Sequence, residues 1–236
     1  MIRKAHRWIG LFVSLQLLAW TLGGIWFSWN DIDNIHGDHL IKLENKKSIS
    51  KSLVSPQLAI DNISDFHSLN NLQVIQILDN PVYKINYIAN SYKQQTILID
   101  ASSGKTHAEI TKQNAIQIAK SNASFDAEIN KVELITETSS HHEYREKPLP
   151  AWAITFDYPS SPTFYVSTKF GTVNAVRHNS WRIFDFFWML HTMDYYGRDN
   201  FSNWFIKIFS IIALITALLG IALFFISRRK FNQHNQ

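Results

Sequence analysis

Two long apolar stretches, one near each end of the chain, constrain its fold more than any other feature. Trp8 to Asn30 contains no Asp, Glu, Lys, Arg or His, and neither does Ile208 to Ser227. At about 1.5 Å per helical residue, each stretch is long enough to cross a hydrocarbon layer about 30 Å thick. The segment between them is polar and, at about 170 residues, large enough for a core of its own. We therefore expect a two-pass membrane protein with one folded domain in its loop.

The charged residues beside these stretches predict the orientation. The basic residues on their terminal sides are Arg3, Lys4, Arg7, Arg228, Arg229 and Lys230. Such charge collects on the cytoplasmic side, so we expect both termini in the cytoplasm and the loop outside it. All 19 acidic residues fall in the loop. The net charge of +4 therefore reflects membrane orientation and does not indicate nucleic-acid binding.

A cleaved signal peptide is the alternative for the first stretch. Its far end carries Trp26, Phe27 and Trp29, where a cleavage site needs small residues. We therefore expect a retained anchor that contacts the lipid bilayer directly.

The loop shows a pattern that occurs twice. A short helix, three strands and a turn with Gly104 are predicted first, with the helix at 56–63 and the strands at 72–77, 82–88 and 95–100. The second round ends in a turn with Gly171, and its predicted helix and strands are 111–121, 129–135, 151–156 and 163–167. We expect an α+β domain of two modules, each a helix packed on a small antiparallel sheet.

The segment from Trp181 to Tyr196 is rich in aromatic residues but too short and too charged to cross a membrane. At 100° per residue, Arg182, Asp185 and Thr192 fall on one side of a helix. The aromatic side carries Phe184, Phe187, Trp188, His191 and Tyr195. This pattern predicts an interfacial helix at the outer membrane surface, with its rings toward the lipid and its polar stripe away from it.

Several of these segments resemble the PepSY-associated transmembrane family. The resemblance rests on Arg3 to Leu11, on His36 to Leu40 and on Trp181 to Tyr195, which reads WRIFDFFWMLHTMDY. The two loop modules resemble PepSY domains. The resemblance implies a bacterial inner-membrane protein with a periplasmic domain. Family members with more spans include iron-regulated membrane proteins and haem-containing ferric-siderophore reductases, whereas this chain has only two predicted spans.

The expected organisation follows from these patterns. In chain order it is a cytoplasmic N-terminus at 1–7, a transmembrane helix at 8–29, a first PepSY-like module with its exit segment at 30–110, a second module at 111–180, an interfacial aromatic helix at 181–196, a transmembrane helix at 204–227 and a cytoplasmic tail at 228–236.

Histidines near the predicted spans are the candidate ligands of a haem b. A b-type haem needs one or two axial imidazoles in an apolar surrounding. The candidates are His6, His36, His39 and His191. His6 and His191 lie at opposite ends of the bilayer, so within one chain only an outer pair such as His36 with His191 is open. A homodimer would pair His6, or His191, with its own copy. The alternative, which we prefer on sequence alone, is that these histidines make interfacial hydrogen bonds and headgroup contacts.

Other chemistry finds little support. The chain has no cysteine, which excludes disulfides, thiolate metal sites and covalent haem attachment. The segment from His141 to Glu146 has no second ligand group at metal-binding spacing, so we interpret it as an exposed polar loop of mixed charge and expect no metal site. The HExxH, GxSxG and glycine-rich phosphate motifs are missing from the sequence. We therefore expect a non-enzymatic module that binds or regulates a protein or peptide partner. The alternative is a haem b electron-transfer subunit of iron acquisition.

Overall fold

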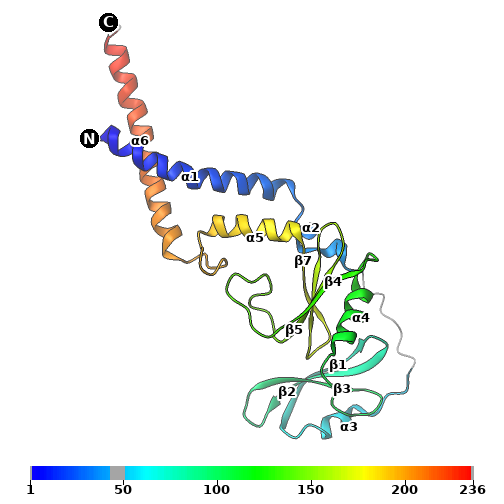
Figure 1. Cartoon of the computed structure of the whole chain (residues 1–236). Helices are drawn as coiled ribbons and strands as arrows, with labels where there is room; N and C mark the ends of the chain where they lie inside the picture. Colours follow the sequence, from blue (N-terminus) through cyan, green and yellow to red (C-terminus); the bar gives the residue numbers. More distant parts are fainter. Residues whose placement is uncertain (1, 43–50, 235–236) are drawn as a thin grey trace. The chain divides into compact units, whose positions relative to one another are not determined.

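The computed structural model describes residues 2–42 and 51–234 (Figure 1). The side chains of Arg3 and of 228–230, which carry part of the predicted orientation, lie outside this description, as do residues 235–236 of the expected tail. The chain divides into two compact units, which are described separately. Unit 1 comprises Met1–His36, Ser139–Arg145 and Asn179–Gln236, and unit 2 comprises Gly37–Thr138 and Glu146–His178.

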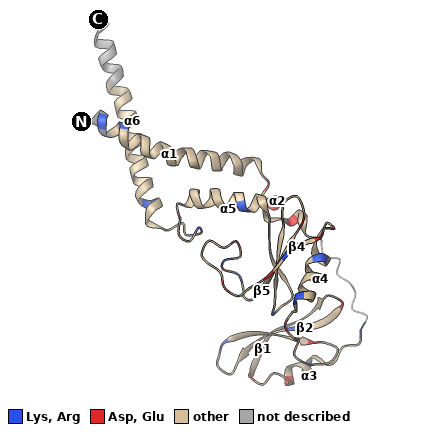
Figure 2. Cartoon of the chain, viewed as in Figure 1, with Lys and Arg blue, Asp and Glu red and all other residues tan. Residues whose placement is uncertain are grey.

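Unit 1 is helical. Its helices are α1 (Ile2–Trp29), α2 (Ile32–His36), α5 (Asn179–Thr192) and α6 (Trp204–His234). Two segments are long and apolar enough to cross a membrane, His6–Trp29 with a mean hydropathy of 1.6 and Trp204–Ile226 with 2.8. Charged residues are sparse along both (Figure 2). Only 11% and 6% of these segments is buried, whereas a core helix of a soluble protein is mostly buried. By length and composition, the chain has the two apolar helices expected of a two-pass membrane protein.

Helix α5 packs along the second half of α1. Trp26 and Phe27 contact the rings of Phe184 and Phe187, whereas the Trp20 ring contacts His191. The two helices therefore run antiparallel.

The far end of this packing is fixed by hydrogen bonds. Gln16 Nε2 and Trp20 Nε1 both donate to the Leu190 carbonyl, at 2.7 and 3.2 Å. This carbonyl belongs to the last turn of α5, where no helical partner is available. If α1 spans the bilayer, the end of α5 lies beside Gln16, which is deeper than the surface position predicted for an interfacial helix.

Unit 2 contains the two antiparallel sheets. Its first part is the short 3-10 helix η1 (Asp38–Leu40), α3 (Pro56–Asp61), β1 (Phe66–Ile77), β2 (Asn80–Ala89) and β3 (Gln94–Asp100). Its second part is α4 (Lys112–Asn122), β4 (Ile129–Ile135), β5 (Ala151–Phe156), β6 (Thr163–Ser167) and β7 (Val173–Arg177). The strand orders are β1-β2-β3 and β4-β5-β6-β7.

Each sheet is preceded in the chain by a helix that packs on it. Ser55 and Thr111 cap α3 and α4, because their side chains accept the amide protons of Gln57 and Asn114, both at 3.3 Å. The buried residues of α3 pack with alternate residues of β2 and with Ile99, and those of α4 pack on β5, β6 and β7. A mixed α+β domain with two antiparallel sheets is therefore confirmed, while the PepSY identity of the modules stays a prediction.

The two parts of unit 2 share one core. Ile77, Val82 and Leu98 point from the first sheet into the cluster that contains Ile154 and Phe164 of the second. The modules therefore cover each other's apolar faces, which neither could bury alone.

Several elements differ in extent from the prediction, and β7 was not predicted as a strand. The differences in β1 and α5 have a clear structural cause. Strand β1 begins at Phe66 rather than at residue 72, because pairing with β2 continues across two register shifts in a polar segment. Helix α5 ends at Thr192 rather than at residue 196. It ends there because the next residue, Met193, has a φ of 52°, which lies outside the right-handed helical region.

Candidate functional site

The connection between β4 and β5 does not stay with the sheet that it joins. Residues Ser139–Arg145 of this connection belong to unit 1, with the helices of that unit. We call Ser139–Arg145 the docking loop. It holds Tyr144, a fully buried side chain, so its position is fixed by packing as well as by charge.

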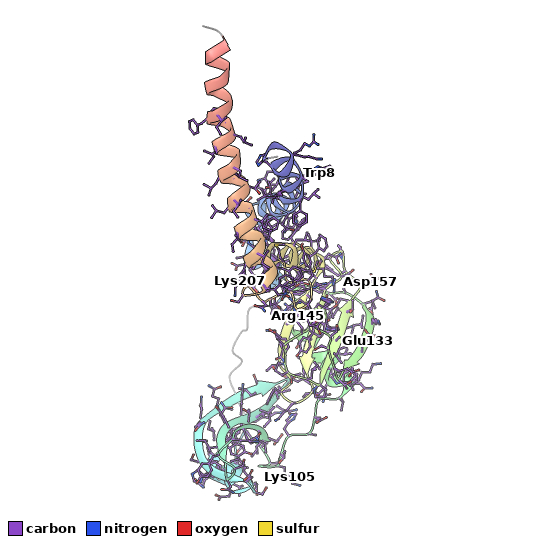
Figure 3. The ribbon with its side chains drawn as sticks, turned by 90° about the vertical axis from the view of Figure 1, so that its left-hand side faces the viewer. Trp8, Lys105, Glu133, Arg145, Asp157 and Lys207 are labelled. Atoms are coloured by element: carbon purple, nitrogen blue, oxygen red, sulfur yellow. The ribbon has the colours of Figure 1, made fainter. Side chains whose placement is uncertain are left out.

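An ion-pair cluster joins the docking loop to α5 and to the segment after it. Arg145 donates to Asp185 at 2.7 Å and to both carboxylate oxygens of Asp199 at 2.7 and 3.1 Å. Arg198 also pairs with Asp185. The Asp185 side chain is only 4% exposed and that of Arg145 10% exposed (Arg145 is labelled in Figure 3). Buried charges of this kind need such pairing, because an isolated charge is too costly to remove from water.

The electrostatics of this cluster favour the charged state of Arg145. Burial alone would lower the pKa of its guanidinium group. The hydrogen bonds and charges of Asp199 and Asp185 outweigh burial and hold that pKa above its usual value. Arg145 is therefore a permanent cation that pairs the docking loop with Asp185 and Asp199.

Two further contacts hold the docking loop. Arg182 makes a two-pronged ion pair with Glu143, at 2.7 and 3.0 Å. His141 Nε2 lies 2.9 Å from the Tyr195 carbonyl oxygen. The prediction that 141–146 form an exposed polar loop is thus wrong for its middle, because Tyr144 is buried and Glu143 and Arg145 are half-buried against α5.

Asp194 holds the segment after α5 in a turn through hydrogen bonds to its backbone. Its two carboxylate oxygens accept the amide protons of Gly197 at 3.0 Å and of Asn200 at 2.9 Å. Burial would raise the pKa of this carboxyl, but the backbone hydrogen bonds outweigh it and lower that pKa below its usual value. The charged form therefore stabilises the turn that leads into α6.

The grouping of Arg182 with Asp185 on one side of a helix was predicted correctly, since both contact the docking loop. The partners in the loop were missed. The available signal was the Glu143-Tyr144-Arg145 triplet, in which two opposite charges flank a large ring and match the opposite charges on α5. Only the tertiary structure pairs them.

The histidines proposed as haem ligands are dispersed. His191 is exposed and lies near the rings of Trp20, Phe27 and Trp188, with centroid distances of 5.8, 6.5 and 6.3 Å. His6 lies next to Gly220 of α6. His36 ends α2 and is exposed, and His39 belongs to unit 2, where its ring is 5.5 Å from that of His178.

Within unit 1 the structure does not bring the predicted pair together. Helix α2 contacts α5 beside its first residues, from which His191 is separated by about 18 Å of helix (Figure 1). His36 and His191 are therefore not positioned as axial ligands of one haem. His6 is also distant from His191, because Trp20, which contacts His191, lies about 21 Å along α1 from it.

Metal binding has no support in the described part of the chain, where no three His, Cys, Asp or Glu side chains are grouped to hold an ion. Comparison of the chain with family models, with curated proteins and with solved structures gave no match. The structure itself therefore carries the functional inference.

Proposed function

We propose that this chain is a two-pass protein of a bacterial inner membrane that presents an α+β domain of two PepSY-like modules to the periplasm. In this proposal both termini are cytoplasmic, and unit 2 binds a protein or peptide partner and regulates it or is regulated by it. The two apolar helices and the basic termini support the topology.

The docked β4–β5 connection is the observation that carries the regulatory role. A domain inserted between two spans needs two passages of the chain between domain and helices. Here the chain passes between the units four times, at 36/37, 138/139, 145/146 and 178/179. The two extra passages flank the docking loop, which one buried and one half-buried ion pair hold to α5. A change in the sheet that carries β4 and β5 would therefore act directly on the membrane-proximal helices.

The test uses the full chain in lipid nanodiscs and a displayed library of dodecapeptides as the binding probe. We expect selected peptides to bind saturably and to change amide hydrogen exchange in the docking loop and in α5. In Arg145→Ala the peptides should still bind, but α5 should no longer respond. Failure to select any binding peptide would overturn the binding role, and an unchanged exchange pattern on binding would overturn the coupling.

Haem binding is the second candidate, and one observation favours it. His191 lies among Trp20, Phe27 and Trp188, the kind of aromatic surrounding that a b-type haem requires. A visible spectrum of the protein, expressed with ample haem, decides between the candidates. A Soret band that disappears in His191→Ala but persists in His67→Ala would establish haem binding at this position. A folded protein without a Soret band would remove this candidate.

A further inference from the structure

Strand β1 has an open outer edge. It is the terminal strand of its sheet, runs for twelve residues and pairs only with β2. From Asn71 to Ile77 its register with β2 is continuous, so its backbone is regular there. Among the residues that the structure describes, no hydrogen bond is recorded from another segment to the backbone of this outer edge. Alternate residues of such an edge present free N–H and C=O groups.

Two other strand edges in unit 2, those of β3 and β4, offer a contrast. The outer edge of β3 is covered, because His107 donates its amide to Leu98 and Asp100 donates to Lys105, both at 2.8 Å. The edge strand β4 carries Lys131 and Glu133, charges of the kind that prevent strands from pairing with it. Strand β1 contains no Asp, Glu, Lys, Arg or Pro over its whole length. It therefore lacks the protection of charge and proline, and its two register shifts are confined to Phe66–Asn71, before the regular part of the strand.

Apolar side chains accompany the open edge. Leu69 and Val74 are 44% and 40% exposed. They pair with Tyr87 and Tyr83, so they lie on the sheet face that carries α3. Helix α3 sits toward the opposite side of the sheet, where its Leu58 contacts Gly104 after β3. On this face Phe66 and Leu72 of β1 pack against the α3 cluster, whereas Leu69 and Val74 stay exposed among the described residues.

The other face of β1 is firmly supported. Ile75 and Ile77 pack into the core shared by the two modules. The edge is therefore a preformed template rather than a flexible segment, which lowers the entropy lost when another strand pairs with it.

We infer that the outer edge of β1, centred on Val74, is the site at which an extended peptide segment of the partner adds as a fourth strand. Only an extended backbone matches a row of free N–H and C=O groups. The edge strand offers no charged side chain to pair with a charge on the segment, and the segment's alternate side chains should be apolar to cover Leu69 and Val74. This inference rests on the proposed function and assigns its binding surface.

The experiment compares variants of the full chain with the dodecapeptides selected on the unmodified protein. Val74→Lys and Leu69→Lys place charge beside the open edge. Leu134→Lys is the matched control, because Leu134 is 47% exposed on the edge strand β4 of the other sheet. A second probe is the best peptide with alternate backbone nitrogens methylated in either phase. Circular dichroism and thermal unfolding establish that each variant is folded.

We expect an alternating apolar pattern in the selected peptides and a loss of affinity of about tenfold or more in Val74→Lys, with Leu134→Lys unchanged. One phase of N-methylation should abolish binding and the other should not, because only one set of peptide N–H groups faces β1. Peptides that bind both lysine variants normally would overturn this site and leave the proposed binding role intact. Absence of any binding peptide would overturn both. Self-association of the chain that Val74→Lys abolishes and that blocks peptide binding would assign the edge to a second copy instead.

Discussion

Asp185 lies at the centre of the contacts that hold the docking loop. It is a carboxylate within an aromatic helix, with Arg145 and Arg198 on its two oxygens and almost no contact with water. Replacing the whole of such a cluster by apolar residues could leave the free energy of unfolding unchanged. Removing one member is destabilising, because it leaves a buried charge without its partner. The cluster therefore specifies which segments meet rather than how tightly the protein folds. Arg145 also lies 5.8 Å from the Trp181 ring, which adds a cation–π contact from the same helix.

Asp185→Asn keeps the volume of the side chain and removes its charge. We expect a loss of about 3 kcal/mol in the stability of unit 1, because both arginines lose a buried partner. Thermal unfolding in detergent and the rate of tryptic cleavage at Arg145 measure the effect. Glu133→Gln is the control: its ion pair with Lys131 has a comparable N–O distance of 2.9 Å, but both side chains are at least half exposed. The control should change stability by about 0.5 kcal/mol or less. Equal losses of stability from the two substitutions would contradict a structural role for the buried ion pairs of Asp185.

Asp194 predicts a pH dependence of the turn into α6. Its pKa is lowered in the folded protein, so its contribution is complete above the pKa of the unfolded chain, about 4. The contribution is lost as the pH falls further, through the folded pKa. We expect Asp194→Asn to lower the unfolding temperature at neutral pH and the difference from the unmodified protein to shrink below about pH 4. Thermal unfolding from pH 7 to pH 3 measures it, and a difference that is independent of pH would contradict this role.

At the scale of elements, the two modules end in the same turn. Asp100 donates its amide to Lys105 and accepts that of Gly104, both at 2.8 Å. Ser167 does the same with Thr172 and Gly171, at 2.9 and 3.0 Å. In each turn the first side chain also accepts the amide three residues later. Both glycines have positive φ, 72° and 60°, which favours glycine over residues with a Cβ atom.

The two glycines differ in the space around them. A Cβ atom at Gly104 would have its nearest neighbours at 3.6 Å, which is ordinary contact. At Gly171 it would lie 3.0 Å from Ile77 Cγ2 and 3.1 Å from Ile110 Cδ1, inside the shared core. We expect Gly104→Ala to cost about 1 kcal/mol from backbone strain and Gly171→Ala at least about 1 kcal/mol more from overpacking. Thermal unfolding compares them, and a larger cost at Gly104 would contradict the packing described.

At the scale of the whole molecule, the absence of cysteine makes topology directly measurable. Tyr92 lies in the β2–β3 turn and is 79% exposed, so a cysteine there should be accessible without disturbing the fold. We expect Tyr92→Cys to react with a membrane-impermeant maleimide in cells whose outer membrane is permeabilised, and Arg229→Cys to react only after lysis. Mass shift on a gel reports the labelling. The reverse pattern would contradict periplasmic exposure of unit 2, and release of the protein without detergent would contradict membrane insertion.

The sequence predicted those features that depend on local periodicity. The apolar helices, α4 and strands such as β2 and β5 follow from patterns within ten to thirty residues. It also matched Gly104 with Gly171. The docking loop could not be predicted in this way, because Glu143 and Arg145 meet partners about forty residues later in the chain. The unpaired outer edge of β1 could not be predicted from the sequence either, since the order of strands is a property of the assembled sheet. Resemblance to the PepSY-associated family remains a prediction.

The docked connection between β4 and β5 also limits how this protein can be dissected. A fragment cut at the unit boundaries, from 37 to 178, would carry Tyr144 and Arg145 without α5 to receive them. A ring and a cation that the other helices normally cover would then be exposed in the connection between two strands of an otherwise intact sheet. Such a truncated piece would be prone to aggregate at this point, and ligand measurements made on it would describe a molecule lacking its natural restraint.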